Sequence, residues 1–332
     1  MGVDPMSFVR VRSKVFLVVL AGMTIGACLQ AVSRADEPYT RKADVIYGRK
    51  FGTALTMDVF SPKGKPNGAA VIIMVSGGFA SNHDSIQPAL ALPFLNRGYT
   101  VFAVVHGSQP KFTVPEIVGD VNRAVRYIRY HAKDYGIDAN RIGVTGASAG
   151  GHLSLMLGTA GTSGDPNAKD PVDRESSRVQ AVACFFPPTD FFNYGSPGKS
   201  IIHAQEHGVQ FRAAFQYEKL DPKTRMWVEV KDEETLKKIA KEVSPLYHVS
   251  ADDPPTLLIH GDADEVVPLQ QSEVMVEALK KAGVKAELVV KPKGGHGWPT
   301  ILLDLTRLAD WFDEHLKAQT IPPETTKGNA TP

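Results

Sequence analysis

The sequence lacks most of the features that place a chain in a special class. It contains only two cysteines in 332 residues, Cys28 and Cys184. Cys28 falls in the N-terminal segment described below, so we expect no disulfide within the mature domain. An excess of one charge is also missing, because the formal net charge is +1. Binding to nucleic acid or to anionic lipid therefore has no electrostatic basis in this sequence.

Long apolar runs are scarce as well. Residues 15–27 form a short one, which is less than a membrane-spanning helix requires, and it follows three basic residues: Arg10, Arg12 and Lys14. This combination is typical of an export signal. Cleavage after Ala35 is one interpretation. A second is a lipoprotein signal ending before Cys28, whose lipidation would hold the protein at a membrane, and a third is an uncleaved anchor. We expect residues 1–35 to be an export signal and the protein to be periplasmic or secreted.

The rest of the chain has the composition of a folded domain, with 43% hydrophobic and 22% charged residues. Apolar segments that resemble buried strands alternate with segments of helical periodicity. The expected strands are residues 69–75, 99–105, 141–145, 179–186, 255–260 and 286–290, and the main expected helices are 88–96, 115–132, 151–157, 268–282 and 299–316. This alternation predicts an α/β protein with a mostly parallel central sheet and helices on both faces.

Three segments fall outside the alternation. Residues 45–47 and 55–60 are predicted to form an antiparallel hairpin at the edge of the sheet. Residues 191–249 are polar and mixed, and we interpret them as a cap inserted into a single domain that spans residues 36–320. Residues 321–332 are predicted to be a disordered tail.

One pentapeptide carries the clearest chemical signal. Residues 146–150 read Gly-Ala-Ser-Ala-Gly, and they lie between an expected strand and an expected helix. A strand, a sharp turn and a helix are the context of a nucleophile elbow, in which the central serine is exposed above the sheet. A chance match within a glycine-rich loop is the alternative. Because the context fits, we predict that Ser148 is a nucleophile.

A serine hydroxyl needs a base beside it, and the base needs a carboxylate to orient it. Asp264 follows one expected strand, and His296 follows the last one, in a loop with three nearby glycines. The order Ser148, Asp264, His296 is the order of the triad in α/β-hydrolases. Asp190 also follows a strand and is the second candidate for the acid. Two other histidines, His152 and His260, are predicted to be structural: the first packed in the core, the second bracing the acid loop.

Acyl transfer also needs backbone N–H groups that bind the developing oxyanion. The Ala149 N–H lies at a helix N-terminus, and Gly77 and Gly78 follow an early strand. We predict that these three supply the donors, although a simple glycine turn is the alternative for residues 77–78. Phe79 comes directly after these glycines, so we expect its ring to border the acyl pocket and to favour short acyl chains.

With these residues in place, the chain resembles the α/β-hydrolase-fold serine esterases from about residue 44 to residue 316. The nearest resemblance is to the bacterial feruloyl and acetyl esterases and to the hormone-sensitive-lipase-like carboxylesterases. It rests on residues 58–62, Asp-Val-Phe-Ser-Pro, and on residues 146–153 around Ser148. The resemblance implies hydrolysis of carboxylic esters, with short-chain or carbohydrate-linked acyl esters as the expected class, and no cofactor. One departure is that Ser76 begins a loop that usually reads His-Gly-Gly-Gly.

Other functions stay open at this point. A serine peptidase of the prolyl-oligopeptidase type shares the layout, but this sequence has no room for the large N-terminal propeller of such enzymes. A non-catalytic binding protein of the same fold is less consistent with an intact triad. His203 and His207 flank Glu206 in an H-x-x-E-H pattern, which in a helix would suggest a zinc peptidase. Gly198 and Gly208 bracket that segment, so we favour a solvated cap helix and expect no metal.

Overall fold

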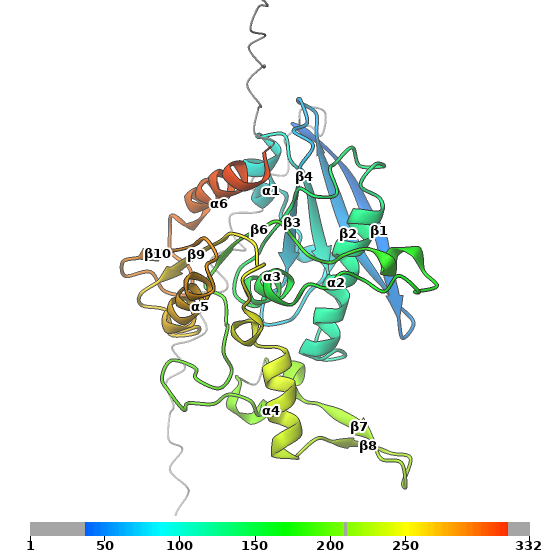
Figure 1. Cartoon of the computed structure of the whole chain (residues 1–332), viewed down its shortest axis with the longest axis vertical. Coiled ribbons are helices and arrows are strands. Elements are labelled where there is room, and N and C mark those ends of the chain that lie inside the picture. Colours follow the sequence, from blue (N-terminus) through cyan, green and yellow to red (C-terminus); the bar gives the residue numbers. More distant parts are fainter. Residues whose placement is uncertain (1–36, 209–210, 318–332) are drawn as a thin grey trace, which may run out of the picture. The chain divides into compact units, whose positions relative to one another are not determined.

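The computed structural model describes residues 37–208 and 211–317 (Figure 1). The expected export segment 1–35 with Cys28, and the expected tail 321–332, lie outside these residues. Within the described part of the chain, none of the helices has the length and apolar character needed to cross a membrane.

The described residues contain a main sheet of eight strands in the order β1-β2-β4-β3-β5-β6-β9-β10. Only β2 runs antiparallel to its neighbours; the other pairs are parallel. The predicted mostly parallel sheet with an antiparallel N-terminal hairpin is therefore confirmed, although both hairpin strands are longer than expected. The strands are β1 (Tyr39–Lys50), β2 (Thr53–Pro62), β3 (Ala70–Val75), β4 (Thr100–Val105), β5 (Ile142–Thr145), β6 (Ala181–Phe185), β9 (Thr256–Gly261) and β10 (Ala286–Lys291).

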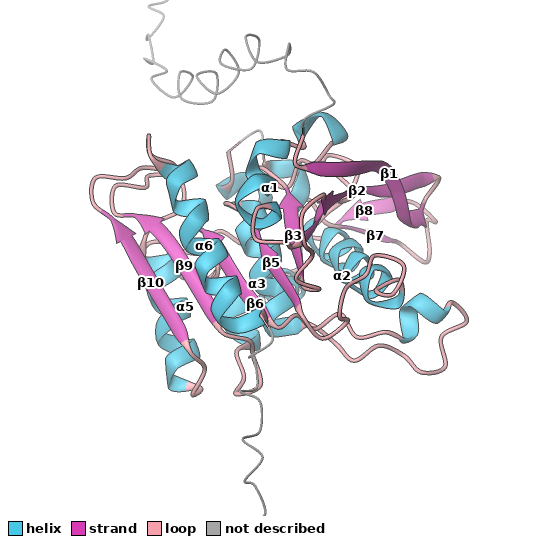
Figure 2. Cartoon of the chain, turned by 90° about the horizontal axis from the view of Figure 1, so that it is seen from above, coloured by secondary structure: helices cyan, strands magenta, loops and turns pink. Residues whose placement is uncertain are grey.

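Helices cover both faces of this sheet because successive strand residues point to opposite sides (Figure 2). Side chains such as Ile72 and Met74 pack with α2 (Val114–Tyr130), α3 (Ala149–Ala160) and α5 (Gln270–Lys281). Their neighbours Val71 and Val75 pack with α1 (Pro88–Leu95) and α6 (Ile301–Leu316) on the other face. The sheet is thus buried between two layers, as its apolar strands predict.

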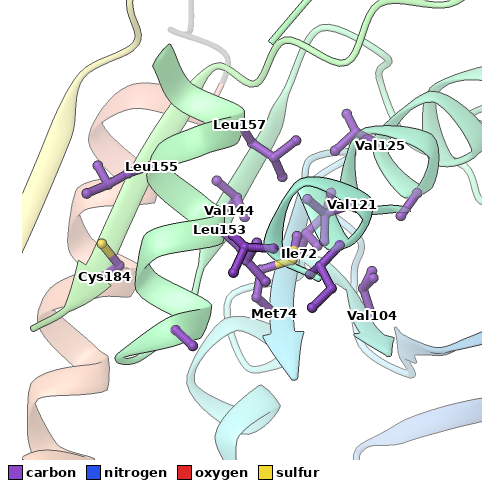
Figure 3. Packing of buried hydrophobic residues seen from close by; sticks show 14 of the residues in the cluster. Ile72, Met74, Val104, Val121, Val125, Val144, Leu153, Leu155, Leu157 and Cys184 are labelled. Atoms are coloured by element: carbon purple, nitrogen blue, oxygen red, sulfur yellow. The ribbon is translucent and has the colours of Figure 1, made fainter. Parts of the chain in front are cut away.

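The core beneath α3, the helix that follows Ser148, is made mostly of aliphatic side chains (Figure 3). Leu153 and Leu157 of α3 and Val144 of β5 belong to the same hydrophobic cluster, and all three are fully buried. Burial of each such side chain stabilises the fold by about 1.5–3 kcal/mol. Cys184 is a free thiol in the same core, and burial raises the pKa of that thiol. Tight packing between α3 and the sheet holds α3 in place, and with it Ser148, the residue that precedes the helix.

Helix α2 begins where its sequence predicts. The Thr113 N–H donates to Glu116 Oε2 at 2.8 Å, which closes the N-terminus. Helical periodicity predicts that Arg129 lies on the outer face of this helix with Arg123 and Arg126. For Arg129 this prediction is wrong. Arg129 is 8% exposed, and its guanidinium donates to the carbonyls of Ser176, Ala139 and Arg178. The loop before β6 covers this part of the helix.

Short elements fill the segment that we interpret as a cap. It contains the hairpin β7 (Glu218–Leu220) and β8 (Trp227–Glu229), helix α4 (Glu233–Glu242), and 3₁₀ turns at Ala204–Glu206, Arg212–Phe215 and Pro245–His248. Cap and sheet belong to one compact unit that begins at Tyr39. Figure 1 shows α4 and the β7–β8 hairpin on the side of the sheet that carries α3 and α5.

Candidate active site

Ser148 lies in a strained turn between β5 and α3. Its φ of 55° and ψ of −121° are unusual for a residue other than glycine. The turn is possible because its neighbours are small: a Cβ on Gly146 would lie 2.5 Å from the Gly150 backbone, and one on Gly150 would lie 2.8 Å from the Met74 carbonyl oxygen. The Ser148 N–H donates to the Phe185 carbonyl at 3.0 Å, which fixes the turn to the neighbouring strand. This is the strand–turn–helix context that the sequence predicts.

The structure brings Ser148, His296 and Asp264 together from three separate loops. His296 Nε2 lies 3.0 Å from Ser148 Oγ, and His296 Nδ1 lies 2.8 Å from Asp264 Oδ2. A carboxylate only accepts, so Nδ1 carries the proton and Nε2 is free to accept from the serine hydroxyl. The three side chains thus have the mutual geometry that a nucleophile, a base and a group orienting the base would need.

Asp264 is held in its ionised form. Burial opposes ionisation, but hydrogen bonds from His260, from His296 and from the Val267 N–H outweigh it and lower the pKa of the carboxyl well below its usual range. Its Oδ1 also accepts the N–H of Val266 at 2.8 Å. The predicted bracing role of His260 is confirmed, because His260 Nε2 donates to the Val267 carbonyl at 2.8 Å and lies 3.4 Å from Asp264 Oδ2.

Backbone contacts join the acid loop to the histidine loop. The Ala263 N–H donates to the Gly294 carbonyl at 2.8 Å, and Asp262 Oδ1 accepts the Lys293 N–H at 2.6 Å. A Cβ on Gly261 would lie 2.2 Å from the Gly294 carbonyl oxygen. The glycines around His296 therefore serve a close approach between two loops, as the sequence indicates.

Asp190, the second candidate acid, lies elsewhere. Its carboxylate accepts the Phe192 N–H at 2.8 Å, the Asn193 amide at 2.9 Å and the Tyr247 hydroxyl at 3.0 Å. Gln271 Oε1 accepts the backbone N–H of Asp190 at 2.8 Å. Asp190 thus anchors the start of the cap, and its hydrogen bonds go to residues other than His296.

Two of the three predicted oxyanion donors are available. Among the described residues no acceptor binds the N–H of Ala149 or of Gly78. The Gly77 N–H, in contrast, donates to the Ala80 carbonyl at 3.0 Å. The prediction that Gly77 is a donor is therefore wrong for this conformation, because a small turn from residue 77 to residue 80 already satisfies that group.

Aromatic residues surround the site in an arrangement that the sequence only partly predicts. The Phe79 ring is 4% exposed and lies edge-on to His152 and Phe215, with ring centroids 5.3 and 5.5 Å away. It therefore joins the cap to the body rather than standing open to solvent. Phe211 of the cap lies against Gly78 instead: a Cβ on Gly78 would be 2.1 Å from the Phe211 ring. No local signal marks Phe211, because only the folded cap brings it to this loop.

The remaining predicted histidines have structural contacts. His152 is fully buried, and its Nε2 donates to the Val243 carbonyl at 2.6 Å, so its predicted core role is confirmed. His203 and His207 do not share a helix face, because the only helix between them is a 3₁₀ turn of 3 residues. His207 donates to the Ile201 carbonyl at 2.8 Å and stacks on Phe215, while His203 lies 3.4 Å from Glu233. The geometry of an H-x-x-E-H zinc site is absent from this described segment.

One described cluster has the spacing of metal ligands, namely Asp44, Asp58 and His83. Asp58 is fully buried, and its Oδ2 accepts a hydrogen bond from Arg41 Nε and forms an ion pair with Arg41 Nη2. The Asp44 N–H donates a hydrogen bond to Asp58 Oδ1 at 3.0 Å. The buried carboxylate is thus already satisfied by a cation and a backbone donor, which makes an ion pair the better account of this cluster.

The strand order, the turn at Ser148 and the loops that carry Asp264 and His296 define a protein of the α/β-hydrolase fold. Comparison with known proteins makes the assignment narrower. Residues 57–279 match the model of the BD-FAE family, and the chain belongs to this family.

Relatives agree with this assignment. The chain is similar to LipM, a probable carboxylic ester hydrolase of Mycobacterium tuberculosis, with 29% identity over 252 residues that cover 75% of this chain and 54% of LipM. Two solved structures are also similar. One is a truncated carbohydrate esterase from gut microbiota, with a TM-score of 0.68, 29% identity and coverage of 84% of this chain and 98% of that chain. The other is an acetyl ester-xyloside bifunctional hydrolase from Caldicellulosiruptor lactoaceticus, with a TM-score of 0.64, 26% identity and coverage of 82% and 95%. The chain spans about half the length of the curated relatives it matches.

Proposed function

We propose that this protein is a serine hydrolase that cleaves carboxylic esters through an acyl-enzyme. The observation that carries the proposal is the contact of Ser148 Oγ with His296 Nε2 at 3.0 Å, with Asp264 behind the imidazole. The unbonded N–H groups of Gly78 and Ala149 give the same site a place for an oxyanion. The ester-hydrolase names of the relatives support the same reaction.

In the proposed first step, His296 Nε2 accepts the hydroxyl proton while Ser148 Oγ attacks the ester carbonyl carbon. The carbonyl π electrons move to oxygen, where the N–H groups of Gly78 and Ala149 stabilise the negative charge. The tetrahedral intermediate collapses, and His296 returns the proton to the departing alcohol. Asp264 keeps the imidazole in the required tautomer and stabilises its charged form.

Water completes the cycle. With His296 again as base, a water molecule attacks the acyl-enzyme carbonyl, and the acid leaves as Ser148 recovers its proton. Every role in both steps falls to a described residue, so the proposal calls for no cofactor.

Short-chain or carbohydrate-linked acyl esters are the substrate class that we propose. The names of the two solved relatives, a carbohydrate esterase and an acetyl ester-xyloside hydrolase, support this class. Phe211 over Gly78 supports a small acyl group. We also propose that the protein is exported, on the basis of the basic and apolar pattern in residues 1–35.

Replacing Ser148 with alanine tests the proposal. Ser148→Ala should lower kcat for p-nitrophenyl acetate by on the order of 10⁴-fold or more, because the nucleophile is lost. A fluorophosphonate probe should label the unaltered protein and leave the variant unlabelled. Circular dichroism should be unchanged, since a methyl group in place of the hydroxymethyl removes no packing. Full labelling of Ser148→Ala would overturn the assignment.

A further inference from the structure

The loop that carries Gly78 is hydrogen-bonded at several points to residues 106–109, which follow β4. We call these residues the anchor segment. The loop of residues 76–81 begins with Ser76, where the esterases that this chain resembles usually have a histidine. His106, Ser108 and Gln109 each hydrogen-bond to this loop, at its beginning, its end and its centre.

His106 holds the beginning of the loop. Its Nδ1 donates to the Gly107 carbonyl at 2.7 Å, which leaves Nε2 to accept the Ser76 hydroxyl at 2.8 Å. The ring is 3% exposed. Burial lowers the pKa of His106 to about 4, so the acceptor stays neutral at neutral pH. Ser76 and His106 together therefore support the beginning of this loop.

Asp120 of α2 supports the anchor segment from behind. Its carboxylate accepts the Gly107 N–H at 2.9 Å and pairs with Lys50 at 2.7 Å. Three elements thus converge on one short segment: β1 through Lys50, α2 through Asp120, and the end of β4. Because these contacts fix the anchor segment, it can hold the loop of residues 76–81 in one conformation.

Gln109 contacts the centre of the loop. Its side-chain amide donates to the Gly78 carbonyl at 2.6 Å, and its backbone N–H donates to the Phe79 carbonyl at 3.2 Å. Gly78 has a φ of 55°, a backbone state that glycine leaves and enters easily. Without an external hold, rotation about Gly78 would turn its N–H away from the oxyanion. We infer that Gln109 is the positioning residue that keeps the Gly78 N–H aimed at the oxyanion.

This inference rests on the proposed function, because it gives Gln109 a role only if Gly78 binds an oxyanion. Loss of that role affects the transition state and leaves ground-state binding intact. Gln109→Leu should therefore lower kcat for p-nitrophenyl acetate by roughly 10- to 100-fold with KM within about twofold. Inhibition by a short alkylboronic acid, whose adduct with Ser148 places an oxygen in the same site, should weaken by a similar factor.

A second variant gives a signature that a merely structural residue would not produce. Gln109→Glu keeps the shape of the side chain but replaces the donor with a carboxylate that repels the Gly78 carbonyl. When that carboxyl is protonated its O–H donates again. The activity of Gln109→Glu relative to the unaltered enzyme should therefore rise as the pH falls from 8 to 5. Gln109→Leu should show a flat ratio over the same range.

Gln180→Leu is the matched control. Gln180 Oε1 accepts the Ile142 N–H at 3.1 Å, at the beginning of β5 and thus at the end of the strand away from Ser148. This variant also loses a side-chain to backbone hydrogen bond, and it should keep kcat within about twofold. If Gln109→Leu and Gln109→Glu both retain full kcat in a protein whose activity Ser148→Ala abolishes, the inference on Gln109 is wrong and the proposed function stands. If Ser148→Ala keeps its activity, the proposed function itself fails.

Discussion

Asp264 and Asp190 show how two buried aspartates after β-strands acquire different roles. Both are less than 10% exposed. Asp264 receives hydrogen bonds from the loop that carries His296, whereas Asp190 receives them from the first residues of the cap and from Tyr247. The difference is set by which segment folds over each carboxylate.

Substitution of each aspartate should separate these roles. Asp264→Asn should lower kcat by on the order of 10³- to 10⁴-fold, because an amide no longer fixes the histidine tautomer or stabilises its charge. Asp190→Asn should keep kcat within a few-fold and lower the free energy of unfolding by about 1 kcal/mol, since it weakens cap contacts. Steady-state kinetics with p-nitrophenyl acetate and urea denaturation measure both. The opposite ranking of the two kcat values would assign the acid role to Asp190.

At the scale of elements, the cap completes the site from a distance in sequence. The turn Arg212–Phe215 places Phe215 on Phe79 and His207, and the preceding Phe211 lies on Gly78. The ring of Phe79, which directly follows Gly77 and Gly78 in the chain, therefore packs between the cap and the rest of the domain. For the proposed ester substrate, the residue best placed to limit the acyl group is Phe211 of the cap.

Alanine substitutions of Phe211 and Phe79 should therefore have different effects on chain-length preference and stability. Phe211→Ala should raise the ratio of hexanoate to acetate cleavage in kcat/KM by about tenfold or more, because each methylene newly accommodated is worth roughly 1 kcal/mol and the larger pocket should admit at least one or two of them. Phe79→Ala should change this ratio less and lower the free energy of unfolding by about 3 kcal/mol, since it leaves a cavity between His152 and Phe215. Chain-length profiles with p-nitrophenyl esters provide the measurement. Equal profiles for Phe211→Ala and the unaltered enzyme would show that Phe211 does not border the acyl group.

At the scale of the whole molecule, folding buries several histidines as neutral imidazoles. Burial lowers the pKa of His106, of His152 and of His207 to about 4 in each case. A histidine whose pKa is lower in the folded than in the unfolded chain binds protons preferentially on unfolding. Its contribution to stability is therefore complete above the unfolded pKa of about 6.5 and is lost as the pH falls toward 4.

His152 allows this linkage to be measured for one group. A shift from about 6.5 to about 4 corresponds to a loss of about 2 kcal/mol in the free energy of unfolding between pH 8 and pH 5. His152→Gln keeps a donor for the Val243 carbonyl but does not titrate. The decrease in the free energy of unfolding from pH 8 to pH 5, measured with urea, should be about 2 kcal/mol smaller in this variant. An identical decrease in both proteins would mean that His152 is already protonated, or already solvated, in the fold.

The sequence by itself determined the parts of the protein that depend on local chemistry. Apolar strands, helical periodicity and the small residues around Ser148 predict the sheet, its helices and the strained turn, because each depends on neighbours a few residues away. The segments that follow the strands also predict where Asp264 and His296 lie, since parallel strands end at one edge of the sheet.

Only the tertiary structure decided which of these groups meet. It directed the Gly77 N–H to Ala80, buried Arg129 under a loop, enclosed Phe79 beneath the cap, and brought Phe211 and Gln109 to Gly78. His203 and His207 fit a zinc pattern in sequence, yet the fold gives them separate partners. Apart from two short-range hydrogen bonds, Gly77 N–H to Ala80 and His207 to Ile201, these outcomes are contacts between segments far apart in the chain. Such contacts follow from how loops pack on a completed sheet, and no local pattern records them.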